Sequence, residues 1–357
     1  MPLSSPNAEN TSERAGGPVA SPPKLPSSGE VVQLATDVAR RLARRWGKEL
    51  DRTSPDEQRM LEIDAEYERA GFLSLLSGEP MRLGDPRAQL IGAALGAMAE
   101  VDCGLAATLL SRMAAMLPWS EAEIGAALVD GWSASRLHPR YRDSLWAWGW
   151  RSSLPATVFR EGPDFHQWEL VPPEGLEYLV VHERMGLRAC TSAEVRLVSR
   201  ARLDTIAADP ELVQDWAESV AGWWATIALS AARAALRYAA DYARTRYQGG
   251  AVLARHALIQ TMFGRGMEGL YAADTLLQRG FAGDRRTLRL GTRLAIRAAE
   301  QAAHTAQQVL GGYGYMREYP VERWLRDVKM AAIASGASAI TWAHAAREEF
   351  WGDDSSP

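Results

Sequence analysis

The sequence predicts an α+β protein that is mostly α-helical, with a helical N-terminal domain, a small central β domain and a C-terminal four-helix bundle. Apolar residues recur three and four positions apart before about residue 119 and after about residue 209, which is typical of amphipathic helices. Between these regions the apolar runs are short, alternating or β-branched, and turn residues separate them. Because helices and strands are segregated along the chain, the pattern favours an α+β fold over a βαβ fold.

The predicted domain boundaries follow these changes of pattern. Residues 1–28 are rich in proline, serine, asparagine and glycine, and we interpret them as a disordered tail because such a composition buries too little apolar surface to order itself. We predict the N-terminal helical domain at residues 29–119, the central β domain at residues 120–208 and the C-terminal four-helix bundle domain at residues 209–352.

Local signals support the two outer domains. Ser54 is predicted to cap a helix that begins at Pro55, since Glu57 completes a capping box three residues later. In the C-terminal domain, amphipathic segments of similar length suit an antiparallel bundle. These segments span residues 215–247, 257–280, 287–310 and 337–351.

Tryptophans cluster at the start of the predicted β domain. Trp146, Trp148 and Trp150 alternate at strand spacing, so we expect them to share one face of a strand. We interpret them as core or interface packing rather than as a shelf for a bound ligand.

Composition narrows the classes of function. The net charge is −4, which favours neither nucleic acid nor an anionic membrane as a partner. No apolar run reaches the roughly 18 to 20 residues that a membrane helix needs, and the N-terminal segment does not look like a secretory signal. Neither the six histidines nor the two cysteines show a metal-binding spacing, so we predict no metal site. The expectation is a soluble, cytoplasmic protein.

A glycine-rich stretch interrupts the C-terminal helices. The sequence from Gln308 to Lys329, "QVLGGYGYMREYPVERWLRDVK", is interpreted as a loop between helical stretches. Gly311, Gly312 and Gly314 permit a positive φ angle and close approach to the backbone, so the stretch could cradle an anion. By itself, however, such a glycine stretch is more often a helix C-cap followed by a sharp turn.

The same stretch resembles the C-terminal signature of acyl-CoA dehydrogenases, Q-x-x-G-G-x-G-Y-x-x-E-Y-P-x-x-R-x-x-R-D. The matching residues are Gln308, Gly311, Gly312, Gly314, Tyr315, Glu318, Tyr319, Pro320, Arg323, Arg326 and Asp327. Three further stretches are similar to the family: "GAMAEVDCGLAATLL", "ERMGLRACTSAEVRL" and "YARTRYQGG" with "VLARHALIQ". The resemblance covers roughly residues 31 to 350.

This resemblance implies an FAD site. It implies that the loop Gln308–Gly314, with Gln308, Gly311, Gly312 and Gly314, approaches the pyrophosphate and adenine end of FAD across a subunit interface. Arg246 matches the family arginine that contacts the same cofactor, and its planar donors suit phosphate oxygens. Without the motif, Arg246 could simply complement the helix dipole. We interpret Arg326 and Asp327 as a structural ion pair.

The catalytic base of the family is missing from its usual place. The family reaction removes the proton α to a thioester carbonyl and passes a hydride to the flavin, and most members use a glutamate as the base. The matching position here is Ser335, and the flavin-contacting threonine is replaced by Ala337. Other members carry the base on the preceding long helix, where the matching position is Val220. Glu218 lies two residues away and is a weak candidate for a relocated base.

Other differences leave several hypotheses open. The family's flavin-binding phrase in the β domain has no counterpart here, and Gly249 stands where the family most often has phenylalanine. The leading hypothesis is an FAD-dependent acyl-CoA dehydrogenase-like enzyme whose base is displaced or supplied by a partner subunit. The alternatives are a catalytically silent subunit of a heteromeric acyl-CoA dehydrogenase and a flavin enzyme of different chemistry. The implied partners are an acyl-CoA substrate, a homo- or hetero-oligomer with a related subunit, and an electron-transfer flavoprotein as acceptor.

Overall fold

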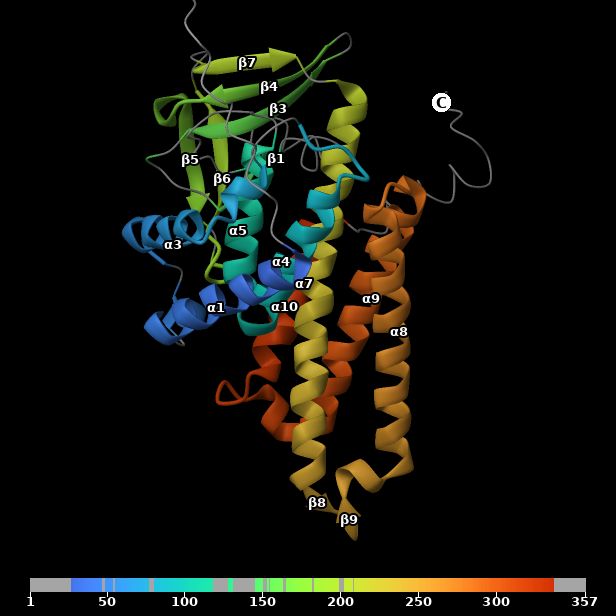
Figure 1. Ribbon diagram of the computed structural model, residues 1–357. Coiled ribbons are helices and arrows are strands. Elements are labelled where there is room, and N and C mark those ends of the chain that lie inside the picture. Colours follow the sequence, from blue (N-terminus) through green and yellow to red (C-terminus); the bar gives the residue numbers. More distant parts are fainter. Residues whose placement is uncertain are drawn as a thin grey trace, which may run out of the picture.

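A computed structural model of the chain confirms the predicted fold class, because helices come first, a sheet follows and long helices close the chain (Figure 1). The structure describes residues 27–46, 49–53, 55–76, 80–117, 128–130, 145–149, 153, 155–162, 165–181, 183–198, 202–207 and 209–336. Nearly all of the predicted tail and the whole of the predicted helix at residues 337–351 lie outside the described residues. The domain boundaries stay predictions.

The N-terminal region is helical, and most residues of its last two helices are buried. The elements are α1 (Ser28–Trp46), α2 (Glu49–Arg52), α3 (Glu57–Arg69), the 3₁₀-helix η1 (Leu73–Leu76), α4 (Pro86–Val101) and α5 (Cys103–Met116). The predicted start of α3 is wrong: the helix begins at Glu57, because the side chain of Asp56 accepts a hydrogen bond from the Arg59 N–H at 2.9 Å and so caps it. Asp102 separates α4 from α5 and caps α5 in the same way.

The central strands form one sheet among the described residues. The elements are β1 (Leu128–Asp130), β2 (Leu145–Trp148), β3 (Ala156–Gly162), β4 (Phe165–Val171), the 3₁₀-helix η3 (Pro173–Gly175), β5 (Leu176–Val181), β6 (Ser192–Leu197) and β7 (Asp204–Ala207). Their order is β5-β6-β2-β1-β3-β4-β7, and every pair is antiparallel except β1 with β3. In β2, Ala147 faces a small core within the sheet, whereas Trp148 belongs to the main core, since successive side chains point to opposite faces.

Tryptophans join the sheet to the long helix α7 (Pro210–Thr245). The ring centroid of Trp148 lies 5.5 Å from that of Trp224, and Trp168 of β4 lies 4.8 Å from Trp216. The predicted packing role of Trp148 is therefore confirmed. The side chains of Trp146 and Trp150 lie outside the part of the chain that the structure describes.

The C-terminal helices run alongside one another (Figure 1). After α7 come β8 (Tyr247–Gln248), β9 (Ala251–Val252), the 3₁₀-helix η4 (Leu253–Arg255), α8 (Ala257–Phe281), α9 (Arg285–Leu310), the 3₁₀-helix η5 (Gly311–Tyr315) and α10 (Val321–Ala334). α9 packs against both α7 and α8, and α10 packs against α7 and α9. The predicted loop at Gln308–Lys329 is thus shorter than expected, because its second half is the start of α10. Among the described helices, none is both long enough and apolar enough to cross a membrane.

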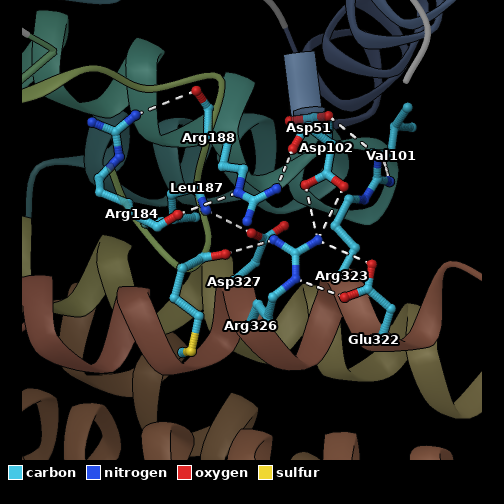
Figure 2. A network of polar contacts seen from close by, with 11 residues as sticks. Asp51, Val101, Asp102, Arg184, Leu187, Arg188, Glu322, Arg323, Arg326 and Asp327 are labelled. Atoms are coloured by element: carbon cyan, nitrogen blue, oxygen red, sulfur yellow. Dashed lines mark hydrogen bonds and ion pairs between the residues drawn. The ribbon is translucent and has the colours of Figure 1, made fainter. Parts of the chain in front are cut away.

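Arg326 of α10 connects three separate parts of the chain (Figure 2). Its Nη2 donates to both carboxylate oxygens of Asp51 in α2, each at 3.0 Å, and its Nη1 donates to the backbone oxygen of Met185 at 2.6 Å. Its Nε donates to Glu322 Oε2 at 2.7 Å. The predicted ion pair of Arg326 with Asp327 is therefore wrong in its partners, because Asp51 and Glu322 are the acids that Arg326 contacts.

Arg323 and Asp327 extend this network on the same helix. Arg323 Nη2 donates to the backbone oxygen of Val101 at 2.9 Å, and its Nη1 lies 3.5 Å from Asp102 Oδ2, at the junction of α4 and α5. Asp327 Oδ1 accepts a hydrogen bond from the Leu187 N–H at 2.6 Å. Burial raises the pKa of the Asp327 carboxyl to about 7, although the Arg323 guanidinium opposes the shift.

Gly186 allows the backbone between β5 and β6 to approach the backbone of α10 closely. It lies between Met185 and Leu187, and a Cβ added there would lie 2.5 Å from the backbone oxygen of Arg326. We expect Gly186→Ala to reduce the free energy of unfolding by roughly 1–3 kcal/mol, because the backbone of α10 cannot move aside cheaply. Urea unfolding measures this loss. Gly264→Ala on α8 is the matched control, since no heavy atom lies within 4 Å of its added Cβ and alanine there favours the helix; equal effects of the two substitutions would contradict the prediction.

The raised pKa of Asp327 predicts that its contribution to stability depends on pH. The folded-state pKa of about 7 lies above the ordinary value of 3.8, so the folded protein binds more protons than the unfolded chain between these values. The contribution is therefore present below about pH 4 and is lost as the pH rises through 7. We expect Asp327→Asn, which cannot ionise, to gain stability relative to the unsubstituted protein between about pH 5 and pH 8. Urea unfolding of both proteins at both pH values checks this, and a difference that does not change with pH would refute it.

Candidate functional site

Arg246 and the glycines of the predicted cofactor loop meet at one end of the bundle. Arg246 caps the C-terminal end of α7, where its backbone N–H donates to the Tyr242 oxygen at 2.9 Å. Its side chain is exposed, and the guanidinium carbon lies 6.0 Å from the ring centroid of Tyr313 in η5. The aromatic ring thus holds the guanidinium beside the glycine loop.

The backbone of this loop is open at two of its glycines. Gly311 has a φ angle of +59°, which glycine favours, and nothing lies within 4 Å of a Cβ added there or at Gly312. Gln308 is exposed at the end of α9. Gly314 differs, because it is buried and its added Cβ would lie 2.5 Å from the Gln307 oxygen, so glycine is required there for packing. An exposed guanidinium beside bare backbone fits an anionic group such as a pyrophosphate.

Two of the positions considered for the catalytic base, Ser335 and Glu218, lie elsewhere, around a small pocket between α7, α9 and the end of α10. Its volume is about 50 Å³, enough for a few water-sized groups. The pocket is lined by Glu218, Ala221, Arg289, Thr292, Arg293, Ser335 and Gly336. Ser335 forms the C-cap of α10 and donates its hydroxyl to the Ala332 oxygen at 2.8 Å.

The structure brings Glu218, and not Val220, into this pocket. Val220 is buried in the main hydrophobic core, with 8% of its surface exposed. Glu218 lies two residues earlier, so it points to a different face of α7, and that face is turned toward α9 and Ser335. Of the positions considered from the sequence, Ser335 and Glu218 are therefore the two that share a pocket.

Burial and nearby arginines set the electrostatics of Glu218. Burial raises the pKa of the Glu218 carboxyl above its ordinary value, and the Arg289 guanidinium opposes this rise. Arg289 Nε lies 2.5 Å from Glu218 Oε1 and holds the carboxylate in one orientation. A buried carboxylate with a raised pKa is suited to accept a proton, and its arginine partner fixes where that proton is taken.

Sequence reasoning missed Arg289, Thr292 and Arg293. The sequence pattern that could have pointed to the arginines is the recurrence of Arg285, Arg289 and Arg293 at every fourth position of α9. This spacing puts them on one face of the helix. These arginines face the acids of α7, as the 2.5 Å ion pair between Arg285 Nη2 and Asp215 Oδ1 illustrates. Over the described stretches of chain, no group of three or more metal-ligating side chains is found.

The two groups of residues lie near opposite ends of α7. Glu218 belongs to the third turn of the helix, whereas Arg246 is its C-cap beside β8 and β9 (Figure 1). Their sequence separation of 28 residues corresponds to roughly 40 Å along the helix axis. A single dinucleotide is much shorter than this, so one molecule cannot contact both groups within one chain.

Comparison with known proteins identifies relatives of the C-terminal helices. Residues 223–350 match the family model "Acyl-CoA dehydrogenase, C-terminal domain". An acyl-CoA dehydrogenase of Bacillus subtilis is 38% identical over 120 residues, which is 32% of this chain and 31% of that protein. The mitochondrial short-chain specific acyl-CoA dehydrogenase of Bos taurus is 29% identical over 181 residues, or 48% of this chain and 44% of that protein. The aligned region thus spans about a third to less than half of the length of these relatives.

Solved structures share the fold over nearly the whole chain. Butyryl-CoA dehydrogenase from Megasphaera elsdenii gives a TM-score of 0.68 at 16% identity and covers 90% of this chain and 98% of its own. A glutaryl-CoA dehydrogenase from Mycobacterium smegmatis in complex with FADH2 gives a TM-score of 0.71 at 15% identity, covering 90% and 94%. At such identities the likeness establishes the fold alone.

Proposed function

Because the chain belongs to the acyl-CoA dehydrogenase family, we propose that it is a subunit of an FAD-dependent oxidoreductase that forms the α,β double bond of an acyl-CoA thioester. The observation that carries the proposal is the pocket in which Glu218 lies beside Ser335, the position of the family's usual base. In this proposal Glu218 is the displaced base.

The chain's own residues account for the proton transfer. Glu218 removes the proton α to the thioester carbonyl, since its burial weakens the solvation of the carboxylate and raises its proton affinity. Arg289 keeps the carboxylate in one orientation through the contact of its Nε with Oε1. When bound, FAD supplies the acceptor for the hydride that leaves the β-carbon.

The FAD site is proposed to be shared between chains. Arg246, with the open backbone at Gly311 and Gly312, would hold the pyrophosphate and adenine end of the cofactor. Because these residues lie about 40 Å from Glu218 along α7, they would serve the FAD of a second chain, either identical or related. An electron-transfer flavoprotein as electron acceptor is proposed from the family resemblance.

A catalytically silent subunit of a heteromeric acyl-CoA dehydrogenase is the second candidate. It is favoured by Ser335, which cannot act as the base unaided, and by the pairing of Glu218 with Arg289. In that case this chain contributes Arg246 and the glycine loop to the cofactor site of a partner subunit, and the partner has its own glutamate base.

The visible spectrum of the purified protein tests cofactor binding. We expect the absorbance of bound flavin when the chain is purified alone or after co-expression with a glutamate-bearing homologue. Arg246→Ala should reduce the free energy of flavin binding by roughly 1.5–3 kcal/mol, the usual contribution of a hydrogen bond to a charged group. Arg244→Ala is the matched control, because that exposed arginine pairs with Asp241 on the same helix. Colourless protein in every combination would rule out the flavoenzyme.

Glu218→Gln tests the base and separates the two candidates. We expect the rate of acyl-CoA oxidation to fall by roughly 10²- to 10⁴-fold while flavin stays bound, because the amide cannot take the proton. Steady-state kinetics measures this, and Glu268→Gln at an exposed position of α8 serves as control. If activity with a partner survives the Glu218 substitution, the base belongs to the partner and the silent-subunit function is supported instead.

A further inference from the structure

Two acid–arginine pairs join α7 to α9 next to each other. Asp215 Oδ1 lies 2.5 Å from Arg285 Nη2, and Glu218 Oε1 lies 2.5 Å from Arg289 Nε. The two acids are three positions apart on α7 and the two arginines are four positions apart on α9, so each pair of like residues shares one face of its helix. Each arginine therefore has a second acid about one helical turn beyond its own partner.

Asp215 and its neighbour Gln214 hold the side chain of Arg285. Arg285 Nη1 donates to Gln214 Oε1 at 3.0 Å, and among the described residues these two side chains are the hydrogen-bond acceptors of the guanidinium. Asp215 is itself anchored, because its Oδ2 accepts a hydrogen bond from the Leu83 N–H at 3.3 Å. Its side chain is only 8% exposed, compared with 35% for Arg285. The buried acid is therefore the fixed partner, and the arginine is the one with room to move.

The charge of Arg285 also acts on Glu218. Burial raises the pKa of the Glu218 carboxyl above its ordinary value. The guanidinium groups that oppose this rise all belong to α9, and they are Arg289, Arg285 and Arg293. The described end of α10 contributes Ser335, which is uncharged. A second arginine in direct contact would favour the ionised carboxylate further, so Glu218 would bind a proton more weakly.

We propose that Asp215 is a positioning residue for Glu218, because it holds the Arg285 guanidinium about one helical turn away from that carboxylate. Arg289 then orients Glu218 without a second direct cation. A general base must be ionised and still accept a proton, and a carboxylate clamped by two guanidinium groups accepts one poorly. The importance of this arrangement for catalysis rests on the proposed function, in which Glu218 is the base, whereas the competition of the two acids for Arg285 does not.

The test measures proton binding by Glu218 in the purified full-length protein, through carbon-13 NMR of labelled glutamate carboxyl groups, with Glu218→Gln to assign the resonance. We expect Asp215→Asn to weaken proton binding by Glu218 roughly tenfold and so move its titration to lower pH, because Arg285 can then contact Glu218. Asparagine keeps an oxygen for the Leu83 N–H, which preserves that contact. Asp241→Asn, which breaks an exposed ion pair near the other end of α7, is the matched control and should leave the titration unchanged.

A second substitution separates this role from the direct effect of the Asp215 charge and from a structural defect. If Asp215 acts through Arg285, then Asp215→Asn should have little effect on the titration of Glu218 in the Arg285→Gln background. The double variant leaves neither charge without its partner, so it also keeps the test valid if Asp215→Asn alone unfolds the protein. An equal effect of Asp215→Asn in both backgrounds, or no effect in either, would overturn the proposal.

The pH profile of acyl-CoA oxidation connects the positioning role to catalysis. In the flavin-loaded protein, the acidic limb of the profile should move to lower pH with Asp215→Asn, in step with the titration of Glu218. If the titration moves and the rate profile does not, the positioning role stands and the base is not Glu218, so the proposed function fails separately. Because the NMR titration needs neither flavin nor thioester, the two failures are told apart.

Discussion

The contacts of α10 with the rest of the chain are the constraint on which the structure depends. Arg326 joins α10 to Asp51, which is 275 positions earlier in the sequence, and Asp327 accepts the Leu187 N–H where the chain lies between β5 and β6. Arg326 and Asp51 are charged and largely buried, so loss of either partner would leave the other charge uncompensated in a medium that solvates it poorly. The signature motif on α10 thus holds the N-terminal helices, the sheet and the bundle in one arrangement.

That arrangement determines where the candidate pocket lies. α10 ends at Ala334, and Ser335 follows as its C-cap, so the position of α10 fixes the position of Ser335 against α7 and α9. The pocket's other walls come from α7 and α9, which the ion pair between Glu218 and Arg289 joins. Ser335 and the carboxylate of Glu218, which comes from another helix and is held by Arg289, therefore line the same pocket.

The two candidate groups of functional residues lie near opposite ends of the long helix α7. Near its N-terminal end, the carboxyl of Glu218 and its partner Arg289 line a small pocket, an arrangement that suits proton transfer. At its C-terminal end are the exposed Arg246 and open glycine backbone, which suit a pyrophosphate. A rigid helix cannot bring its two ends together, so the two sets of residues within one chain cannot contact the same small molecule.

The sequence by itself determined the fold class, the order of helices and strands and the family resemblance, because apolar periodicity and a contiguous motif are local properties of the chain. By that resemblance it also pointed to Ser335 as the position that matches the family's usual base. Only the tertiary structure decided that Glu218 rather than Val220 lies beside Ser335, and that Arg326 pairs with Asp51 rather than Asp327. These facts depend on which helix faces are brought together by packing, and residues that are distant in sequence carry no local signal of the neighbours they will meet.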